Sequence, residues 1–191
     1  FLMREVIFGN DGNYSQDNLI QRNNTELSNK IGNLIQRTCS FIFKNCEQKI
    51  PDVSKEFIEK MYQDVFFVQL QNIVKDIITQ MANYNINAVL DHIMYITEQS
   101  NIYIDREAPW SLKNSDPRKM NEVLYRIVET VRYIGILMQP FIPDSAAKIL
   151  DQLSVPENNR NFRHLTKEFA IKPCTRISEP RPIFPRLEIR N

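Results

Sequence analysis

Apolar residues recur at intervals of three and four along most of the first 153 residues, and no other feature of the sequence restricts the fold as much. Such spacing lines one face of an α-helix with apolar side chains. The chain also has only four glycines in 191 residues, which disfavours the tight turns of β-hairpins. We therefore predict an all-α fold, an up-and-down bundle of four to five helices joined by short loops.

The first helices are predicted from the turn-forming and capping residues near the start of the chain. A cluster of glycine, asparagine and aspartate at residues 9–12 indicates a turn. Ser15 then begins a short helix that is expected to end near Gln21. The pattern restarts at residues 24–25, and its apolar stripe predicts a second helix to about Lys44.

The next helical region begins at Ser54, a residue that caps helix N-termini well. Its apolar stripe continues to about Met81. Residues 66–68 interrupt the stripe, so a bend and a separate first helix both remain open. Asn85 is expected to cap the following helix.

The strongest helix start is Asp116 followed by Pro117, because aspartate caps the helix and proline fits its first position. Gln139 and Pro140 should end this helix, and Pro143 opens a last one that runs to residue 150 or 153. The core face of the helix after Pro117 is predicted to consist of Met120, Leu124, Ile127, Val131, Ile134 and Met138.

The two ends of the chain lack this regularity. The run from Phe1 to Phe8 is apolar but too short for its periodicity to separate helix from strand. Because it begins without methionine, we expect the chain to be a piece of a longer protein. Residues 154–191 are rich in proline and are predicted to form an extended tail with room for one short strand. The tail is expected to pack back onto the bundle through Ile183, Phe184 and Leu187.

Charge and cysteine content restrict the partners and the compartment. The net charge is only +1, so any contact with RNA must be local, and neither a membrane nor DNA is predicted as a partner. Neither a signal peptide nor an apolar run of transmembrane length occurs in the sequence. Cys39, Cys46 and Cys174 are an odd number without a C-x-x-C pair, which indicates reduced thiols and a cytoplasmic protein without a metal site.

Catalytic signatures are absent from the sequence. The two histidines, His92 and His164, are isolated from each other and from any nucleophile motif. The phosphate-binding glycine loop and metal-ligand spacings are missing as well. No catalytic residue and no cofactor are therefore predicted within these 191 residues.

Asn33, Arg37 and Trp110 are the candidate binding residues, and Pro109 precedes the single tryptophan. Proline biases the residue before it away from the helical region, so the preceding helix should end near residue 106 or 107. Trp110 at this corner is either a core plug or a platform for a nucleic-acid base. Asn33 and Arg37, one helical turn apart, suit the edge of an unstacked base, although their spacing alone favours ordinary surface roles.

Four motifs in order along the chain resemble bacterial methionyl-tRNA synthetases. R-E-V-I-F-G-N-D-G-N-Y-S at residues 4–15 is similar to the segment after that family's catalytic domain, and N-T-E-L-S-N-K-I-G-N-L-I-Q-R from Asn24 resembles its first anticodon-domain helix. N-I-Y-I-D-R-E-A-P-W from Asn101 resembles the N-x-Y-I-D-x-x-x-P-W motif. P-I-F-P-R-L-E from Pro182 resembles the end of the core enzyme.

The resemblance implies a division of the chain and a site. Residues 1–14 would be the end of the connection from the catalytic domain, 15–153 the anticodon-binding bundle of a class Ia synthetase, and 154–191 the tail. The resemblance also implies that the CAU anticodon of tRNA(Met), and especially its wobble cytosine, is recognised by Asn33, Arg37 and Trp110, with Pro109 shaping the corner.

The resemblance also implies the activity of the whole protein, a ligase that attaches methionine to tRNA(Met) with ATP. The catalytic signatures of that family are missing from these residues. ATP and magnesium would therefore be bound by a catalytic domain joined in cis, and zinc there is left open. Two alternatives remain: the equivalent domain of a valyl, isoleucyl, leucyl or cysteinyl enzyme, and a helical interaction domain that binds no RNA. The RNA-binding hypothesis requires residues 33, 37 and 110 to meet at one accessible end of the bundle.

Overall fold

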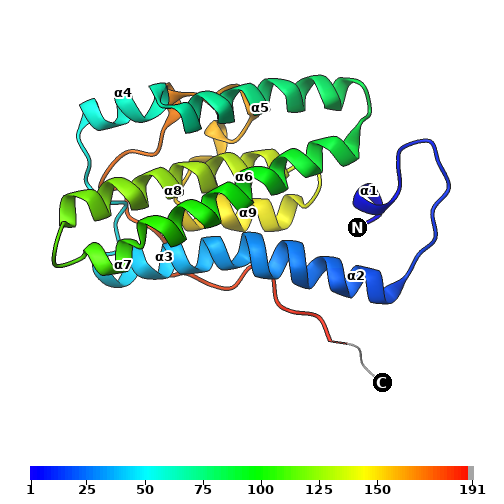
Figure 1. The fold of residues 1–191 in the computed structure, drawn as a ribbon, viewed down its shortest axis with the longest axis horizontal. Coiled ribbons are helices and arrows are strands. Elements are labelled where there is room, and N and C mark those ends of the chain that lie inside the picture. The colour runs from blue at the N-terminus through cyan, green and yellow to red at the C-terminus, as the bar shows by residue number, and fades with distance from the viewer. Residues whose placement is uncertain (189–191) are drawn as a thin grey trace.

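The computed structural model describes residues 1–188 and confirms the all-α prediction. Within that range the β-structure amounts to a single bridge between Lys49 and Arg176. Figure 1 shows long helices lying side by side, with α2 and α3 along one edge and α5 along the other. The α-helices are α1 (Leu2–Glu5), α2 (Gln16–Arg22), α3 (Asn33–Asn45), α4 (Lys55–Gln63), α5 (Val65–Ala82), α6 (Ile86–Glu107), α7 (Pro109–Leu112), α8 (Pro117–Met138) and α9 (Pro143–Gln152).

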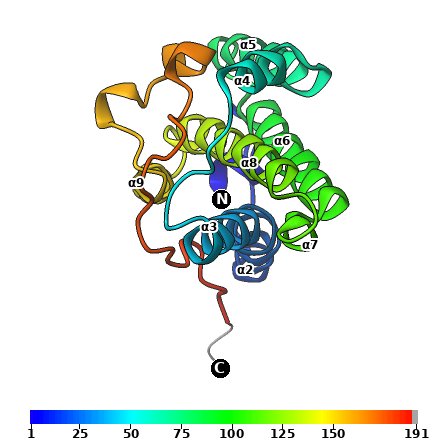
Figure 2. The same cartoon turned by 90° about the vertical axis from the view of Figure 1, so that its left-hand side faces the viewer.

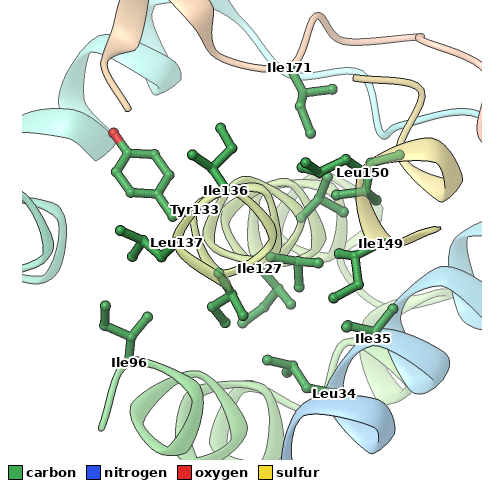
Figure 3. Close-up of a cluster of buried hydrophobic side chains, with 14 of the residues drawn as sticks. Leu34, Ile35, Ile96, Ile127, Tyr133, Ile136, Leu137, Ile149, Leu150 and Ile171 are labelled. Atoms are coloured by element: carbon green, nitrogen blue, oxygen red, sulfur yellow. The ribbon is translucent and has the colours of Figure 1, made fainter. Parts of the chain in front are cut away.

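Helix α8 forms the centre of the core. Figure 3 shows it end-on, with side chains directed toward α3, α6, α9 and the C-terminal segment. All six residues of its predicted core face are buried, but so is every residue from 127 to 138. The expectation of a one-sided amphipathic helix was therefore wrong for α8. Its second face is covered by α9 and by the segment that follows α9, which lacks the helical pattern that would have revealed it.

A buried ion pair joins that second face to the C-terminal segment. Glu129 and Arg132 have no exposed side-chain surface, and Glu129 Oε1 accepts hydrogen bonds from Arg132 Nε at 2.9 Å and Nη2 at 2.5 Å. The second carboxylate oxygen of Glu129 accepts from the backbone N–H of Ile171, and Arg132 Nη1 donates to the carbonyl oxygen of His164 at 2.6 Å. Burial lowers the pKa of Arg132, but the Glu129 carboxylate more than offsets this and raises it above its ordinary value. The guanidinium of Arg132 therefore stays charged and paired with Glu129.

The predicted break between Gln21 and Asn24 was wrong, because α2 continues into α3 without a break. The connecting segment, η1 (Asn23–Gly32), is a π-helix, a rare form that is frequent at functional sites. Asparagine usually ends helices by bonding to its own neighbouring backbone. Here the side chains of Asn23 and Asn24 bond instead to the carbonyl oxygens of Pro185 and Leu187, so the tail removes the reason for a break.

Three of the four predicted side-chain caps are confirmed, and the fourth, at Asn85, was wrong. Ser15, Ser54 and Asp116 each accept a hydrogen bond from the backbone N–H three residues later. Asn85 stands at the start of α6 but its side chain does not cap it, and donates instead to Gln80 Oε1 at 2.9 Å.

The question left open at residues 66–68 is answered by a separate helix, α4, that ends before Asp64. Asp64 is in an extended conformation, and its Oδ1 accepts from the N–H of Phe67, in the first turn of α5. Its other oxygen forms an ion pair with Arg126 of α8. The ion pair with α8 therefore helps to fix Asp64 in the extended conformation that separates α4 from α5.

The ends of the chain differ in part from the expectation. Residues 2–5 form the one-turn helix α1, whose Arg4 pairs with Glu26 and Asp91. Ile183 and Phe184 pack onto the bundle as predicted, but Leu187 is 38% exposed and is held through its backbone. The tail is also less extended than predicted, since it contains three one-turn 3-10 helices: η2 (Glu157–Asn159), η3 (Phe162–His164) and η4 (Lys167–Phe169). The last three residues of the predicted tail, 189–191, lie outside the described residues.

Among residues 1–188, no helix combines the length and the apolar character needed to cross a membrane. The three cysteines are free, and they differ in exposure: Cys39 is buried, Cys46 is half-buried and Cys174 is exposed.

Removing one partner of the Glu129–Arg132 pair should destabilise the fold strongly. We expect Glu129→Leu to lower the free energy of unfolding by about 3–5 kcal/mol, because it leaves the guanidinium buried and unpaired. The double variant with Arg132→Met should lose less than Glu129→Leu alone. Urea unfolding followed by circular dichroism measures both. Arg118→Met, which removes an exposed ion pair with Glu122 on the same helix, is the control and should change stability by no more than about 0.5 kcal/mol. A loss below about 1 kcal/mol for Glu129→Leu would contradict this account.

The three thiols should react at very different rates in the folded protein. Burial raises the pKa of Cys39 to about 12 and that of Cys46 to about 11, and the thiolate is the reactive form. At about pH 8, Ellman's reagent should therefore titrate Cys174 rapidly and the other two only after unfolding in guanidinium. Rapid reaction of all three thiols without denaturant would show that the core opens easily at α3.

Candidate nucleic-acid interface

The corner between α6 and α7 places the single tryptophan. Helix α6 ends at Glu107, as predicted from Pro109, and Ala108 then adopts a left-handed conformation with φ 43° and ψ 61°. The Ala108 carbonyl oxygen accepts hydrogen bonds from the backbone N–H of Ser111 at 2.9 Å and from its hydroxyl at 2.8 Å. Pro109 is buried beneath the corner and forms the first residue of α7. The chain therefore reverses sharply and directs the next residue outward.

Trp110 is 43% exposed, so it is not a core plug. The guanidinium carbon of Arg37 lies 4.9 Å from the centre of its ring. A cation at this distance from an indole face is attracted by the ring electrons and limits the ring's motion. The structure thus brings together two of the predicted site residues, from helices far apart in sequence.

A carboxylate orients the arginine over the ring. Arg37 Nη2 donates to Asp105 Oδ1 at 2.7 Å, and both side chains remain partly in solvent. An exposed pair of this kind contributes less than about 1 kcal/mol to stability. Its effect is geometric, because it fixes where the planar guanidinium lies. Asp105 was not among the predicted site residues, although it is part of the motif that ends at Trp110.

Asn33 is exposed on α3, one turn before Arg37. At about 100° per residue the two side chains point about 40° apart around the helix axis. Figure 2 shows α3 with α7 on one side and the C-terminal segment on the other. Asn33 therefore lies next to the Arg37–Trp110 stack and also lines a groove between α3 and residues 182–184.

Charged groups surround the corner. The Glu107 carboxylate accepts from Lys119 Nζ and from Arg106 Nε, both at 3.0 Å. The hydrogen bond from Lys119 is the largest of several effects that hold the pKa of Glu107 below its usual range. Burial raises the pKa of Tyr103, whose ring lies 5.4 Å from the guanidinium of Arg106. Glu107 is thus charged, and Tyr103 neutral, at neutral pH.

The two histidines lie in structural contacts away from this corner. His92 Nε2 is 2.6 Å from Asp76 Oδ2 and links α6 to α5, while His164 is buried and its Nδ1 accepts from the backbone N–H of Asn161. In the part of the chain that the structure describes, histidine, cysteine and acidic residues do not form a group of three that could hold a metal. What the corner can do is bind a flat, polar ligand: the indole offers a stacking surface, and the guanidinium and amide offer hydrogen bonds.

Comparison with known proteins gives two family matches that together cover most of the chain. Residues 1–39 match a family described as class I tRNA synthetases (M), and residues 50–188 match the anticodon binding domain of methionyl tRNA ligase. The boundary between them falls after Asn33 and Arg37 and before Trp110. Arg37 lies in the first matched region and Trp110 in the second, so the stack joins residues from both.

Similar proteins of known sequence and structure agree with these matches. The chain is 50% identical to the methionine–tRNA ligase of Rickettsia bellii over 188 residues and 39% identical to that of Mesorhizobium japonicum over 189. These alignments cover 98% and 97% of this chain but only 37% and 36% of the relatives. The free form of Mycobacterium tuberculosis methionyl-tRNA synthetase superposes on all of this chain with a TM-score of 0.89 at 30% identity, over 38% of its own length.

The fold and these matches define the class as the all-α anticodon-binding bundle of a class I aminoacyl-tRNA synthetase. The chain belongs to the family of methionyl-tRNA ligase anticodon-binding domains. It spans about 37% of the length of the Rickettsia bellii relative. The valyl, isoleucyl, leucyl and cysteinyl alternatives are therefore set aside.

The left-handed conformation of Ala108 should make this position sensitive to side-chain shape. We expect Ala108→Val to lower the free energy of unfolding by about 1–3 kcal/mol, because β-branched residues are strained at positive φ. Ala108→Gly is the matched control and should be neutral or slightly stabilising, since glycine adopts this conformation freely. Urea unfolding measures stability, and Trp110 fluorescence reports the position of the ring. Equal stability of the two variants would show that the corner is not strained.

Proposed function

We propose that this chain recognises the anticodon of tRNA(Met) as part of a methionine–tRNA ligase. The observation that carries the proposal is the Arg37–Trp110 stack, which holds a half-exposed indole beside an exposed asparagine at one end of α3. Bases of single-stranded RNA loops are held by this combination of an aromatic plane and hydrogen-bonding side chains. Membership in the family supports the choice of methionine.

Each residue has a distinct role in the proposal. Trp110 stacks on the wobble cytosine of the CAU anticodon, and Pro109 shapes the corner that presents it. Arg37 donates to the acceptors on the base's Watson–Crick edge, while the amide of Asn33 has both a donor and an acceptor for the same edge.

The activity of the whole protein would reside in the part of the relatives that this chain does not span. Attachment of methionine to tRNA(Met) requires ATP, which with magnesium would be bound by a catalytic domain joined in cis. The homologous Mycobacterium tuberculosis enzyme has been solved with methionyl-adenylate. Residues 1–14 would be the end of the connection to that domain, 15–153 the anticodon-binding bundle and 154–191 a supporting tail. The proposal places the protein in the cytoplasm.

Affinity should come from the stack more than from phosphate contacts. The net charge of +1 provides little general attraction to RNA, and neutralised phosphates usually supply much of the binding energy. We therefore expect the chain to bind an anticodon stem–loop weakly, with a shallow dependence on salt.

Trp110→Ala should weaken binding of a CAU anticodon stem–loop to this chain by about tenfold or more, because stacking contributes about 1–3 kcal/mol per base. Fluorescence anisotropy of a labelled stem–loop measures the Kd. Tyr95→Ala is the control: Tyr95 is 39% exposed on α6, away from α7, and its removal should leave the Kd unchanged. A stem–loop with guanine in place of the wobble cytosine should compete poorly.

Two results would refute the proposal. One is a Kd for Trp110→Ala within twofold of that of the unchanged chain. The other is equal competition by the CAU and guanine-substituted loops. The first result would favour a helical interaction domain that binds no RNA.

A further inference from the structure

The π-helix η1 ends directly at the candidate site. It covers Asn23–Gly32, and the next residue along the chain is Asn33. The backbone N–H of Asn33 bonds to the carbonyl oxygens of Ser28 and Lys30, five and three residues earlier, whereas an α-helix would use the residue four earlier. Because Asn33 is exposed, packing does not fix its amide. The direction of that amide therefore follows from the backbone that the π-helix presents.

The tail lies along this π-helix and runs in the opposite direction. Phe184 is buried against Gly32 at the end of the π-helix, where a Cβ atom would lie 3.5 Å from the Phe184 side chain. Three residues later, the backbone of Leu187 exchanges two hydrogen bonds with the side chain of Asn24, at 2.9 and 2.8 Å. Figure 1 shows the tail leaving the bundle at the edge formed by α2 and α3. The tail thus contacts the π-helix near both of its ends.

The reach of the tail fits a π-helix better than an α-helix. The three residue steps from 184 to 187 span at most about 11 Å when fully extended. The eight steps from Asn24 to Gly32 would span about 12 Å in an α-helix. A π-helix of the same number of residues is shorter, because each of its turns contains more residues. Both contacts of the tail are therefore satisfied together when the segment between them is π-helical.

Gly32 fits the same geometry. A Cβ atom at this position would lie 3.1 Å from the carbonyl oxygen of Leu27, five residues earlier, which is closer than ordinary van der Waals contact. The residue five earlier is the hydrogen-bonding partner in a π-helix. Glycine inside a helix is otherwise destabilising relative to alanine. Its presence here leaves room for the π-helical turn and for Phe184.

The segments on either side of Asn24 and Gly32 are held without the tail. Leu34 and Ile35 of α3 are buried in the core. Glu26, near the start of the π-helix, forms ion pairs with Arg4 and Arg22. Loss of the hydrogen bonds to the tail should therefore leave the bundle folded, and should allow α-helical turns to form just before Asn33.

We propose that Asn24, by binding the backbone of Leu187, maintains the π-helix and thereby positions the amide of Asn33 for its ligand. Asn24 is a positioning residue, because it precedes Asn33 by nine residues, about 13 Å along an α-helix, and does not touch the ligand itself. Trp110 is placed by a different element, the corner after α6, so its contribution should not depend on Asn24. The effect on binding rests on the proposed function.

A double-mutant cycle tests the positioning role. Asn24→Ala should raise the Kd of this chain for the CAU stem–loop by about three- to tenfold, because the conformation that binds becomes a minor one. Asn33→Ala should also weaken binding. Adding Asn33→Ala to Asn24→Ala should raise the Kd by less than about twofold more, although sites this far apart normally contribute independently. Such coupling would show that Asn24 acts through Asn33, whereas Asn24→Ala and Trp110→Ala should combine additively.

A variant in the tail breaks the same contact without changing the helix. It is needed because Asn24 Oδ1 also accepts a hydrogen bond from Asn23. Leu187→Pro removes the N–H that donates to Asn24 and should weaken binding as Asn24→Ala does. Leu187→Ala is the matched control, since it keeps the N–H and shortens an exposed side chain; the Kd should stay unchanged.

Thr25→Ala is the control within the π-helix. Thr25 is exposed and follows Asn24, and the two substitutions raise helix propensity by similar amounts. Thr25→Ala should leave the Kd unchanged, so an equal effect of both substitutions would assign the change to helix propensity and refute the role of the tail. Circular dichroism at the assay temperature should show every variant folded.

The outcomes distinguish this inference from the proposed function. If Trp110→Ala weakens binding but Asn24→Ala does not, or if the effects of Asn24→Ala and Asn33→Ala add fully, the positioning role is refuted and the proposed function stands. The same holds if Asn33→Ala has no effect, or if Leu187→Ala weakens binding as much as Leu187→Pro. If Trp110→Ala has no effect, the proposed function fails, and this inference fails with it.

Discussion

The buried ion pair of Glu129 and Arg132 is the interaction on which the rest of the structure depends. It lies on the face of α8 that the other long helices leave uncovered, and it bonds to the backbone at residues 164 and 171. Tyr62 of α4 donates to the same carboxylate at 2.5 Å. One pair of charges therefore binds the central helix, α4 and the returning C-terminal segment. Such a pair is tolerated in the interior only because nearly every donor and acceptor is satisfied.

The consequences of this anchor extend to the candidate site. Once the C-terminal segment is fixed along α8, its continuation crosses α3, where Phe184 packs on Gly32 and the asparagines of the π-helix bind residues 185 and 187. The π-helix in turn sets where Asn33 and Arg37 face. The corner at Ala108 positions the remaining residue of the site, because it turns Trp110 toward Arg37. The site is thus assembled from three regions far apart in sequence.

Predictions based on local chemistry were confirmed most often. Ser15, Ser54 and Asp116 cap their helices because a cap needs only a side-chain oxygen and an N–H three residues away. The end of α6 before Pro109 likewise follows from the proline ring and its neighbour. Two predictions, the cap by Asn85 and the break after Gln21, were wrong for a common reason. In both cases an asparagine side chain found a more distant partner, Gln80 in one case and the tail in the other.

The sequence by itself determined the helical class, most helix limits and the residue types of the site, since these depend on spacing, capping and side-chain chemistry. Only the tertiary structure decided that α8 is buried on every side, that Arg37 lies on the face of Trp110, and that the tail and the π-helix enclose a groove beside Asn33. The reason is physical. The helical period shows which side chains share a face, but which face meets which neighbour depends on packing between segments far apart in the chain. In the sequence, Glu129 and Arg132 resemble an ordinary exposed ion pair, and only the segments packed against them show that both are buried.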